Sequence, residues 1–345
     1  MNPGASRFNS RHRIKGIGAV FTLTTFLFSC SVANPPCKEP DPACDPVSAF
    51  FAYIYVLTDR WVAVGMTGNI ATSPNGQSDW SSFNFPGTTL RAVNYGAQGF
   101  VAVGDTGRII LSPTGLSGDW TEQTSGTSDE LRDVTFGNGL YVAVGGINGA
   151  SDRILISFDG VSWMDRSLGL GNRLDHVIFA NNQFYAVGQG GVRATSVDGF
   201  TWTNENIGPN PWAGIAFGNG VFLIADDASS MHTSTSFSGF PNITGSFTSA
   251  ITDAVTFVPE KGVFFLSGDG GETFTTANGL GAAAQGDILT STSSDVATNG
   301  SNVAVTNLAG AIHYSANLST FSQSTVGAQD WFGITFARAP KVYGP

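Results

Sequence analysis

Seven equivalent pairs of positions, about 40 residues apart, carry side chains of this 345-residue chain that could do chemistry. Arginine can bind a carboxylate in a bidentate manner, and aspartate or histidine can accept a proton or pair with an arginine. The charged or titratable members are Arg91, Arg132, Asp133, Asp175, His176, Asp253 and Asp295. If the fold brings them together, they form a polar ring that binds a ligand or a partner peptide. Solvated strand ends or salt-bridged neighbours are the simpler interpretation.

The segment Leu131–Trp163 shows most clearly the unit that must position these side chains. A β-rich run leads into the turn signal Gly137-Asn138-Gly139 and then into a second β-rich run, Tyr141–Val144, which together predict a hairpin. A third strand, Arg153–Ser157, is followed by an Asp-Gly turn and an aromatic anchor. The run after the anchor completes a four-stranded unit.

Other segments repeat this unit. The position of Gly145 recurs at a spacing of 38 to 43 residues, as Gly65, Gly104, Gly188, Asp226, Gly268 and Asn307. A period near 40 with four short strands is typical of propellers. We therefore predict an all-β fold, a seven-bladed β-propeller of four-stranded antiparallel blades over residues 49–345. An eighth start, Trp331–Phe336, either pairs with the first blade as a closing clasp, displacing or flanking Phe51–Val56, or begins an incomplete eighth blade.

Each unit carries, after its third strand, a side chain able to form an Asx or Ser/Thr turn. These residues are Asn75, Thr114, Asp159, Asp198, Ser236, Asn278 and Asn317. Glycine follows in five units, and an aromatic residue comes shortly afterwards in six. Seven occurrences indicate a requirement of the fold.

The S-x-D-G-x-x-W turn after a VAVG strand resembles the Asp-box (BNR-type) β-propellers, over residues 50–340. That family spans sialidases, sortilin-like receptors, plant-type photosystem assembly factors and many bacterial surface proteins. The resemblance implies the propeller fold and says little about function, because the box is a structural turn outside the blade. Ser267–Phe274 fits a stricter form of the box, but the repeat phase places it between the second and third strands, which we favour.

Residues 1–29 resemble a bacterial lipoprotein signal peptide, with a basic start and the apolar run Gly16–Ser29. The resemblance implies a mature chain that begins at a lipid-modified, palmitate-bearing Cys30. Ser31 in place of aspartate implies the outer membrane of a bacterial cell envelope. An ordinary secretory signal or an uncleaved anchor is the alternative.

Residues 30–48 predict an extended tether, because they are rich in proline and charge and have no periodicity. Cys37 and Cys44 are the only cysteines besides Cys30. In an exported protein we expect them to form a disulfide with each other. A metal site is the rival interpretation, although no histidine lies nearby.

Composition narrows the function classes. Charged residues make up 12% of the chain, about half the usual share, as suits a turn-rich all-β protein. The net charge of −10 argues against a nucleic-acid partner. The propeller region lacks cysteine, and His176, His232 and His313 lie in different repeats without metal-ligand spacing, so we expect surface histidines, no metal and no cofactor.

Two function classes remain. The favoured one is a non-catalytic surface lipoprotein whose propeller is a binding or scaffold module for a protein or glycan partner. The alternative is a glycan-active hydrolase of the sialidase-like kind, which needs converging carboxylates and arginines. The early F/Y-R-I-P motif of sialidases is missing here, so that label would rest on the box alone.

Overall fold

The computed structural model describes residues 57–206, 211–226, 230–237, 245–246, 251–279, 283–287, 289 and 291–340. The chain divides into two compact units, Met1–Tyr55 and Val56–Pro345, and every described residue belongs to the second. The predicted signal peptide, the tether and the first predicted propeller residues lie outside the described part. Within the described part, the structure contains no helix of the length and apolar character that a membrane span requires.

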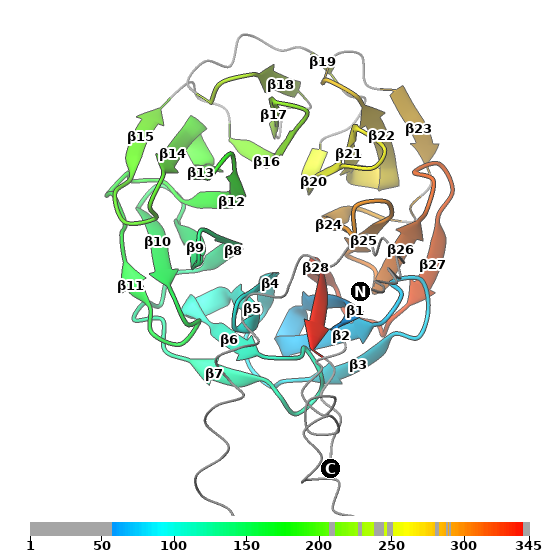
Figure 1. Cartoon of the computed structure of the whole chain (residues 1–345), viewed down its shortest axis with the longest axis horizontal. Helices are drawn as coiled ribbons and strands as arrows, with labels where there is room; N and C mark the ends of the chain where they lie inside the picture. Colours follow the sequence, from blue (N-terminus) through cyan, green and yellow to red (C-terminus); the bar gives the residue numbers. More distant parts are fainter. Residues whose placement is uncertain are drawn as a thin grey trace, which may run out of the picture. The chain divides into compact units, whose positions relative to one another are not determined.

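Seven sheets, each of four antiparallel strands, stand around a central channel as the blades of a propeller (Figure 1). This arrangement confirms the predicted fold class and number of blades. From the innermost strand outwards, blade 1 contains β28 (Trp331–Pro340), β1 (Leu57–Gly65), β2 (Asn69–Ser73) and β3 (Ser81–Asn84); blade 2 contains β4 (Leu90–Gly96), β5 (Gly99–Gly104), β6 (Ile109–Ser112) and β7 (Thr121–Gln123); blade 3 contains β8 (Leu131–Gly137), β9 (Leu140–Ile147), β10 (Ser151–Ser157) and β11 (Met164–Asp165).

The remaining blades follow the same order. Blade 4 contains β12 (Leu174–Ala180), β13 (Gln183–Gly188), β14 (Val192–Ser196) and β15 (Thr203–Asn206); blade 5 contains β16 (Trp212–Gly218), β17 (Val221–Asp226), β18 (Ser230–Ser234) and β19 (Gly245–Ser246); blade 6 contains β20 (Ile251–Val258), β21 (Val263–Gly268), β22 (Glu272–Thr276) and β23 (Ala283–Asp287); blade 7 contains β24 (Ser293–Thr298), β25 (Val303–Asn307), β26 (Ala311–Ser315) and β27 (Ser322–Thr325). The 3-10 turns are η1 (Met66–Gly68), η2 (Asp105–Gly107), η3 (Gln189–Gly191) and η4 (Asp269–Gly271).

The last strand closes the ring. β28 pairs antiparallel with β1 in a register that places Trp61 opposite Phe336 and Val64 opposite Gly333. The C-terminal strand is therefore the innermost strand of blade 1, and the closing-clasp interpretation is confirmed. Residues 51–56, which we predicted as a strand of that blade, lie outside the described residues.

The hydrophobic cores lie between neighbouring blades. One cluster joins Val142 and Ile156 of blade 3 to Leu174 and Phe184 of blade 4. Each blade therefore buries its faces against its neighbours, as the repeat period predicts.

Close packing of two main chains explains the recurring glycine. A Cβ atom on Gly145 would lie 2.0 Å from the carbonyl oxygen of Glu130, the residue that precedes β8. The same clash, at 2.0 to 2.2 Å, would arise at Gly65 with Asp330, at Gly104 with Thr89 and at Gly188 with Arg173. These positions need glycine because a side chain would collide with rigid backbone.

Two blades replace this glycine with a buried polar side chain that pairs with a histidine six residues later. In blade 5, Asp226 accepts a hydrogen bond from Ser230 N (2.7 Å) and lies 3.1 Å from His232 Nε2. In blade 7, Asn307 Nδ2 lies 3.1 Å from His313 Nε2. A polar cap thus takes the place of the missing glycine.

The expectation that His313 is a surface residue was wrong, because its exposed fraction is 2%. Asn307 Oδ1 already accepts the N–H groups of Ala309 (3.1 Å) and Ala311 (3.0 Å), so its amide nitrogen donates to a neutral ring. Burial lowers the pKa of His313 to about 4.

The outer turns repeat one hydrogen-bond pattern. In blade 3, Gly160 N donates to Ser157 Oγ (2.8 Å), and Val161 N (2.9 Å) and Ser162 N (2.8 Å) donate to Asp159 Oδ1. The N–H groups of Ser162 and Val161 hold the pKa of Asp159 below its ordinary value. The equivalent residues Asn75, Asp198 and Asn317 each accept two such bonds, Thr114 accepts one, and Asn278 lies in the corresponding turn after β22.

Ser267–Phe274 lies where the repeat phase predicts. It covers the end of β21, η4 and the start of β22, so it joins the second and third strands of blade 6.

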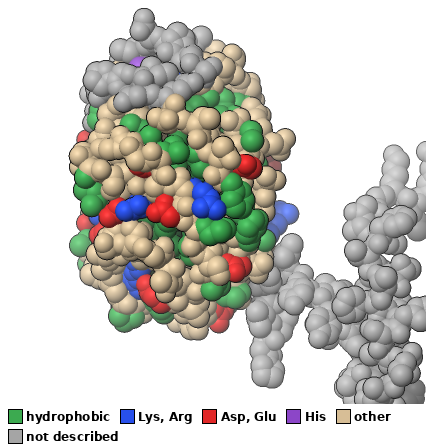
Figure 2. All heavy atoms as spheres, turned by 90° about the vertical axis from the view of Figure 1, so that its left-hand side faces the viewer, with side chains coloured by type: hydrophobic (Ala, Val, Ile, Leu, Met, Phe, Trp, Pro, Cys, Tyr) green, Lys and Arg blue, Asp and Glu red, His purple; other side chains and the backbone are tan. Residues whose placement is uncertain are grey.

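On the side of the ring shown in Figure 2, acidic and basic side chains alternate in a row and do not gather by sign.

Candidate functional site

The innermost strands begin at one mouth of the central channel, and their side chains line a cavity of about 300 Å³. Arg91, Arg132, Asp133, His176 and Asp295 all line this cavity. Five sequence-predicted site residues from four blades therefore meet in one place, which we call the channel mouth. Asp175 adjoins His176 on β12, and Asp253 lies on β20, although its side chain is outside the described part.

Glu130 is the centre of an ion-pair network at this mouth. Its Oε1 lies 3.1 Å from Arg91 Nε and 3.0 Å from Arg132 Nη1, and its Oε2 lies 3.4 Å from Arg173 Nη1. Arginines from blades 2 and 3 and from the approach to blade 4 thus share one carboxylate. Arg91 also lies 5.0 Å from the centroid of the Phe332 ring.

Two further carboxylates complete the network. Asp105 binds Arg91 Nε at 2.7 Å, and Asp175 binds Arg173 Nε at 2.6 Å and Gln189 Nε2 at 2.5 Å. The three arginine side chains are 19 to 26% exposed, whereas Asp175 is 4% exposed. Because the arginines remain reachable from solvent, the network orients them without hiding them.

Asp133 and Asp295 tie neighbouring blades together. Asp133 accepts Val134 N at 2.7 Å on its own strand and Val177 N at 2.8 Å on the next blade. Asp295 does the same with Val296 N (2.7 Å) and Ile334 N (2.8 Å). Both carboxyl groups therefore hold the channel wall together by satisfying main-chain donors.

The channel also carries a titrating group near neutral pH. Burial raises the pKa of Asp295 to about 8, the Ile334 N–H opposes this rise, and Asp133 adds to it. Part of the Asp295 residue is reachable from the channel, but the protein around it removes most of its hydration. His176 Nδ1 lies 4.0 Å from Asp133 Oδ2, and both residues line the same cavity as Asp295.

The described residues contain no group of three or more histidine, cysteine or acidic side chains placed to hold a metal ion. The chemistry that the mouth can offer is recognition by oriented guanidinium groups beside a polar cavity. Cys30, Cys37 and Cys44 lie outside the described residues, so the lipid site and the disulfide stay predictions.

Known structures share the fold at low sequence identity. The chain is similar to apo AztD from Citrobacter koseri, with 11% identity and a TM-score of 0.51; the match covers 83% of this chain and 100% of that chain. It is also similar to YCF48 bound to D1 peptide, with 14% identity and a TM-score of 0.52; the match covers 68% of this chain and 80% of that chain. A third similar structure is a chain of a nidogen–laminin complex, with 12% identity and a TM-score of 0.52; the match covers 81% of this chain and 98% of that chain. No protein-family model and no curated protein sequence matches the chain. These similarities show a propeller fold and no more.

Sequence reasoning missed three members of the network: Glu130, Arg173 and Asp105. Glu130 and Arg173 directly precede an innermost strand, and Asp105 directly follows the recurring glycine of blade 2. The close approach of that glycine to the residue before the innermost strand brings these positions to the mouth. The signal was therefore present two residues before the selected pairs for Glu130 and Arg173, and next to the recurring glycine for Asp105.

Proposed function

We propose that this protein is a lipid-anchored propeller of the Asp-box kind that acts as a non-catalytic binding module, with a peptide segment of a protein partner as its ligand. The observation that carries the proposal is the cluster Arg91, Arg132 and Arg173, oriented by Glu130 beside the channel cavity. Among the similar structures, one is YCF48 bound to D1 peptide and another is a nidogen–laminin complex, so this fold can support protein binding.

The chemistry favours a partner segment with an acidic side chain. A guanidinium group has five N–H donors in a fixed plane, more than one carboxylate can accept, so a second carboxylate can bind beside Glu130. Phe332 lies against Arg91 and supplies an apolar surface at the same place. Arg91 and Arg132 lie on innermost strands that pair with the next strand of their blade, and a backbone fixed in this way lowers the entropy cost of binding.

Site-specific photo-crosslinking in intact envelopes tests this proposal. A photoreactive amino acid at exposed Thr88, just before β4, should capture a partner protein, whereas one at exposed Ala97, in the β4–β5 turn at the far end of the blade, should not. The double variant Arg91→Gln/Arg132→Gln should remove the Thr88 crosslink. Capture at Ala97 alone, or a Thr88 crosslink that survives the double variant, would contradict a role for the mouth.

Arg338→Gln is the matched control for the loss of arginine. Arg338 is 72% exposed and pairs with Asp59 at 3.2 Å near the far end of β28, so it is an ion-paired arginine away from the mouth. This variant should leave the Thr88 crosslink unchanged.

The alternative, a glycan-active hydrolase, receives less support from the mouth. Glycosidases need one carboxyl group as acid and a second as base or nucleophile. Here Asp133 and Asp295 are bonded to main-chain N–H groups, and Asp175 is bonded to Arg173 and Gln189. A panel of fluorogenic glycosides and sialosides should therefore show no release above background, and release that Asp133→Asn abolishes would favour the hydrolase.

The anchor needs its own test. Cys30→Ala should abolish incorporation of labelled palmitate and move the protein from the membrane fraction to the periplasm or medium. Palmitate labelling that persists in the variant would contradict Cys30 as the lipid site. Detection of a Cys37–Cys44 disulfide by mass spectrometry of the unreduced protein would complete the picture of the tether.

A further inference from the structure

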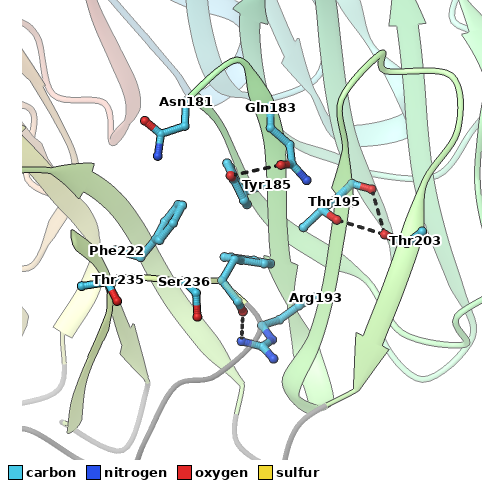
Figure 3. Close-up of a pocket in the computed structure, with 10 residues that line it drawn as sticks. Asn181, Gln183, Tyr185, Arg193, Thr195, Thr203, Phe222, Thr235 and Ser236 are labelled. Carbon is cyan, nitrogen blue, oxygen red and sulfur yellow. Dashed lines mark hydrogen bonds between the residues drawn. The ribbon is translucent and has the colours of Figure 1, made fainter. Parts of the chain in front are cut away.

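A second cavity lies between blades 4 and 5, and its lining runs from the β12–β13 turn to the outer strands of blade 4 (Figure 3). Its volume is about 330 Å³, within the range of small-molecule sites. We call it the blade 4–5 pocket. Blade 4 contributes residues from β13, β14 and β15, and blade 5 contributes Phe222 and the turn residues Thr235, Ser236 and Phe237.

The repeat supplies an internal control for this pocket. In blade 4, Tyr185 pairs across the ladder with Thr195. The equivalent pairs are Val101 with Leu111 in blade 2 and Val142 with Ile156 in blade 3. Blades 2 and 3 thus place aliphatic pairs here, and a threonine at the Thr195 position recurs as Thr72, Thr233 and Thr275 in blades 1, 5 and 6, so the tyrosine is the feature particular to blade 4.

A buried arginine, Arg193, also lines the blade 4–5 pocket. Arg193 pairs across from Val187, the position that Ile109 and Ile154 occupy in blades 2 and 3, and its exposed fraction is 1%. Its Nη1 donates to the carbonyl oxygen of Phe237 at 2.6 Å, and its Cζ lies 5.1 Å from the centroid of that ring. It fixes the turn of blade 5 that forms one wall of the pocket.

That turn departs from the pattern of the better-formed blades. Phe237 stands where five blades have glycine, and its ring packs on Tyr185 (4.8 Å between centroids) and Phe222 (5.6 Å). In blade 4, Gly199 packs close to Leu140, and a Cβ there would lie 2.9 Å from its Cδ1 atom. The blade 4–5 pocket therefore has an aromatic wall that includes Tyr185 and Phe237, where the blade 3–4 interface has Val142 and Gly199.

The rest of the lining is polar and uncharged. Tyr185 Oη donates to Gln183 Oε1 at 3.3 Å, and the hydroxyl oxygens of Thr195 and Thr203 lie 3.0 Å apart (Figure 3). Asn181 lies at the same end of the pocket as Gln183 (Figure 3). Amide and hydroxyl groups can both donate and accept hydrogen bonds, and none of the ten residues that line the pocket is acidic.

We propose that the blade 4–5 pocket binds a neutral hexose unit. Ring hydroxyl groups both donate and accept, which matches the amide and hydroxyl groups of the lining. Tyr185, Phe222 and Phe237 are only 2 to 8% exposed, so the aromatic wall closes one side of the pocket and the polar groups provide the recognition. The only charged lining residue, Arg193, is buried and bonded to the main chain, so the pocket does not require an anion. This site is separate from the channel mouth and does not depend on the function proposed above.

Ligand-observed NMR on the full chain tests the proposal. Glucose, galactose, mannose and N-acetylglucosamine should be compared with their methyl glycosides, which represent a unit joined to a longer glycan. Glucuronate serves as the anionic comparison. At least one neutral sugar should show saturation transfer with a Kd on the order of 1 mM, given its small number of atoms.

Two variants and one control locate the binding. Thr195→Val removes a hydroxyl group with little change in shape, and Gln183→Ala removes an amide; each should weaken binding about threefold to tenfold. Thr72→Val makes the same change at the equivalent position of blade 1, where Thr72 pairs with Val62, and should leave the Kd unchanged. The proposal fails if no neutral sugar binds, if only glucuronate binds, or if Thr195→Val and Thr72→Val behave alike.

Discussion

The outer turns repeat one hydrogen-bond pattern in most blades, whereas the residues of the channel mouth vary between blades. In six blades, the hydroxyl group of the Ser or Thr that ends the third strand accepts the same main-chain N–H bond, from Gly76, Gly115, Gly160, Gly199, Gly279 or Leu318. At the mouth, Asp133 and Asp295 share a pattern of bonds, and the residue types at the selected positions differ from blade to blade. Recurrence thus marks what the backbone needs, and departure from it marks surfaces available to a ligand.

Gly145→Ala, at a recurring position, should reduce the stability of the protein most. Its Cβ would meet the Glu130 carbonyl oxygen at 2.0 Å, so either the hairpin or the start of β8 must move. We expect a loss of about 3 kcal/mol in the free energy of unfolding, measured by urea denaturation. Gly149→Ala is the control, because a Cβ there has no atom within 4 Å and only its φ of +72° is unfavourable, which costs about 1 kcal/mol. Equal losses in the two variants would remove the steric explanation.

The fold could be predicted from the sequence because its steric and hydrogen-bond requirements are local and recur in each blade. Gly145 and Asp159 satisfy their requirements within about 20 residues, so their copies could be recognised one by one. The site was predicted in part, since the innermost strand starts were recognised but Glu130 and Arg173 were not. Which arginine meets which carboxylate depends on side chains of neighbouring blades, and a repeat pattern does not encode those pairings.

His313→Gln should give the next largest effect, which is a change in how stability depends on pH in acid. A folded-state pKa of about 4 against an ordinary value of 6.5 means that the unfolded chain binds the proton first. The stability that the neutral ring contributes is complete above pH 6.5 and is lost as pH falls towards 4, by about 2 to 3 kcal/mol. Urea midpoints at pH 7.5, 5.5 and 4.5 should fall less steeply in the variant. An unchanged slope would mean that another group causes the loss.

Gly160→Ala should cost less, because the outer turn lies against side chains that can move. Its φ is +71°, and an added Cβ would lie 3.2 Å from methyl groups of Leu111 and Val101. We expect a loss of about 1 to 2 kcal/mol in the free energy of unfolding. Gly126→Ala, at φ +78° with no atom within 4 Å, measures the backbone term alone. A smaller loss at Gly160 than at Gly126 would show that the turn packs less closely than described.

Glu130→Gln should change stability least and binding most. Glu130 is 24% exposed, so removing its charge should alter the free energy of unfolding by less than about 1 kcal/mol. Three arginines would lose a shared carboxylate, and a fluorescent hexaglutamate probe should then bind about threefold to tenfold more tightly, with the gain shrinking at high salt. Glu122→Gln is the matched control, because Glu122 is 52% exposed and pairs with Arg108 on the outer strands. If both variants raise probe affinity equally, net charge explains the effect; if only Glu130→Gln does, the mouth is the surface that recognises acidic groups.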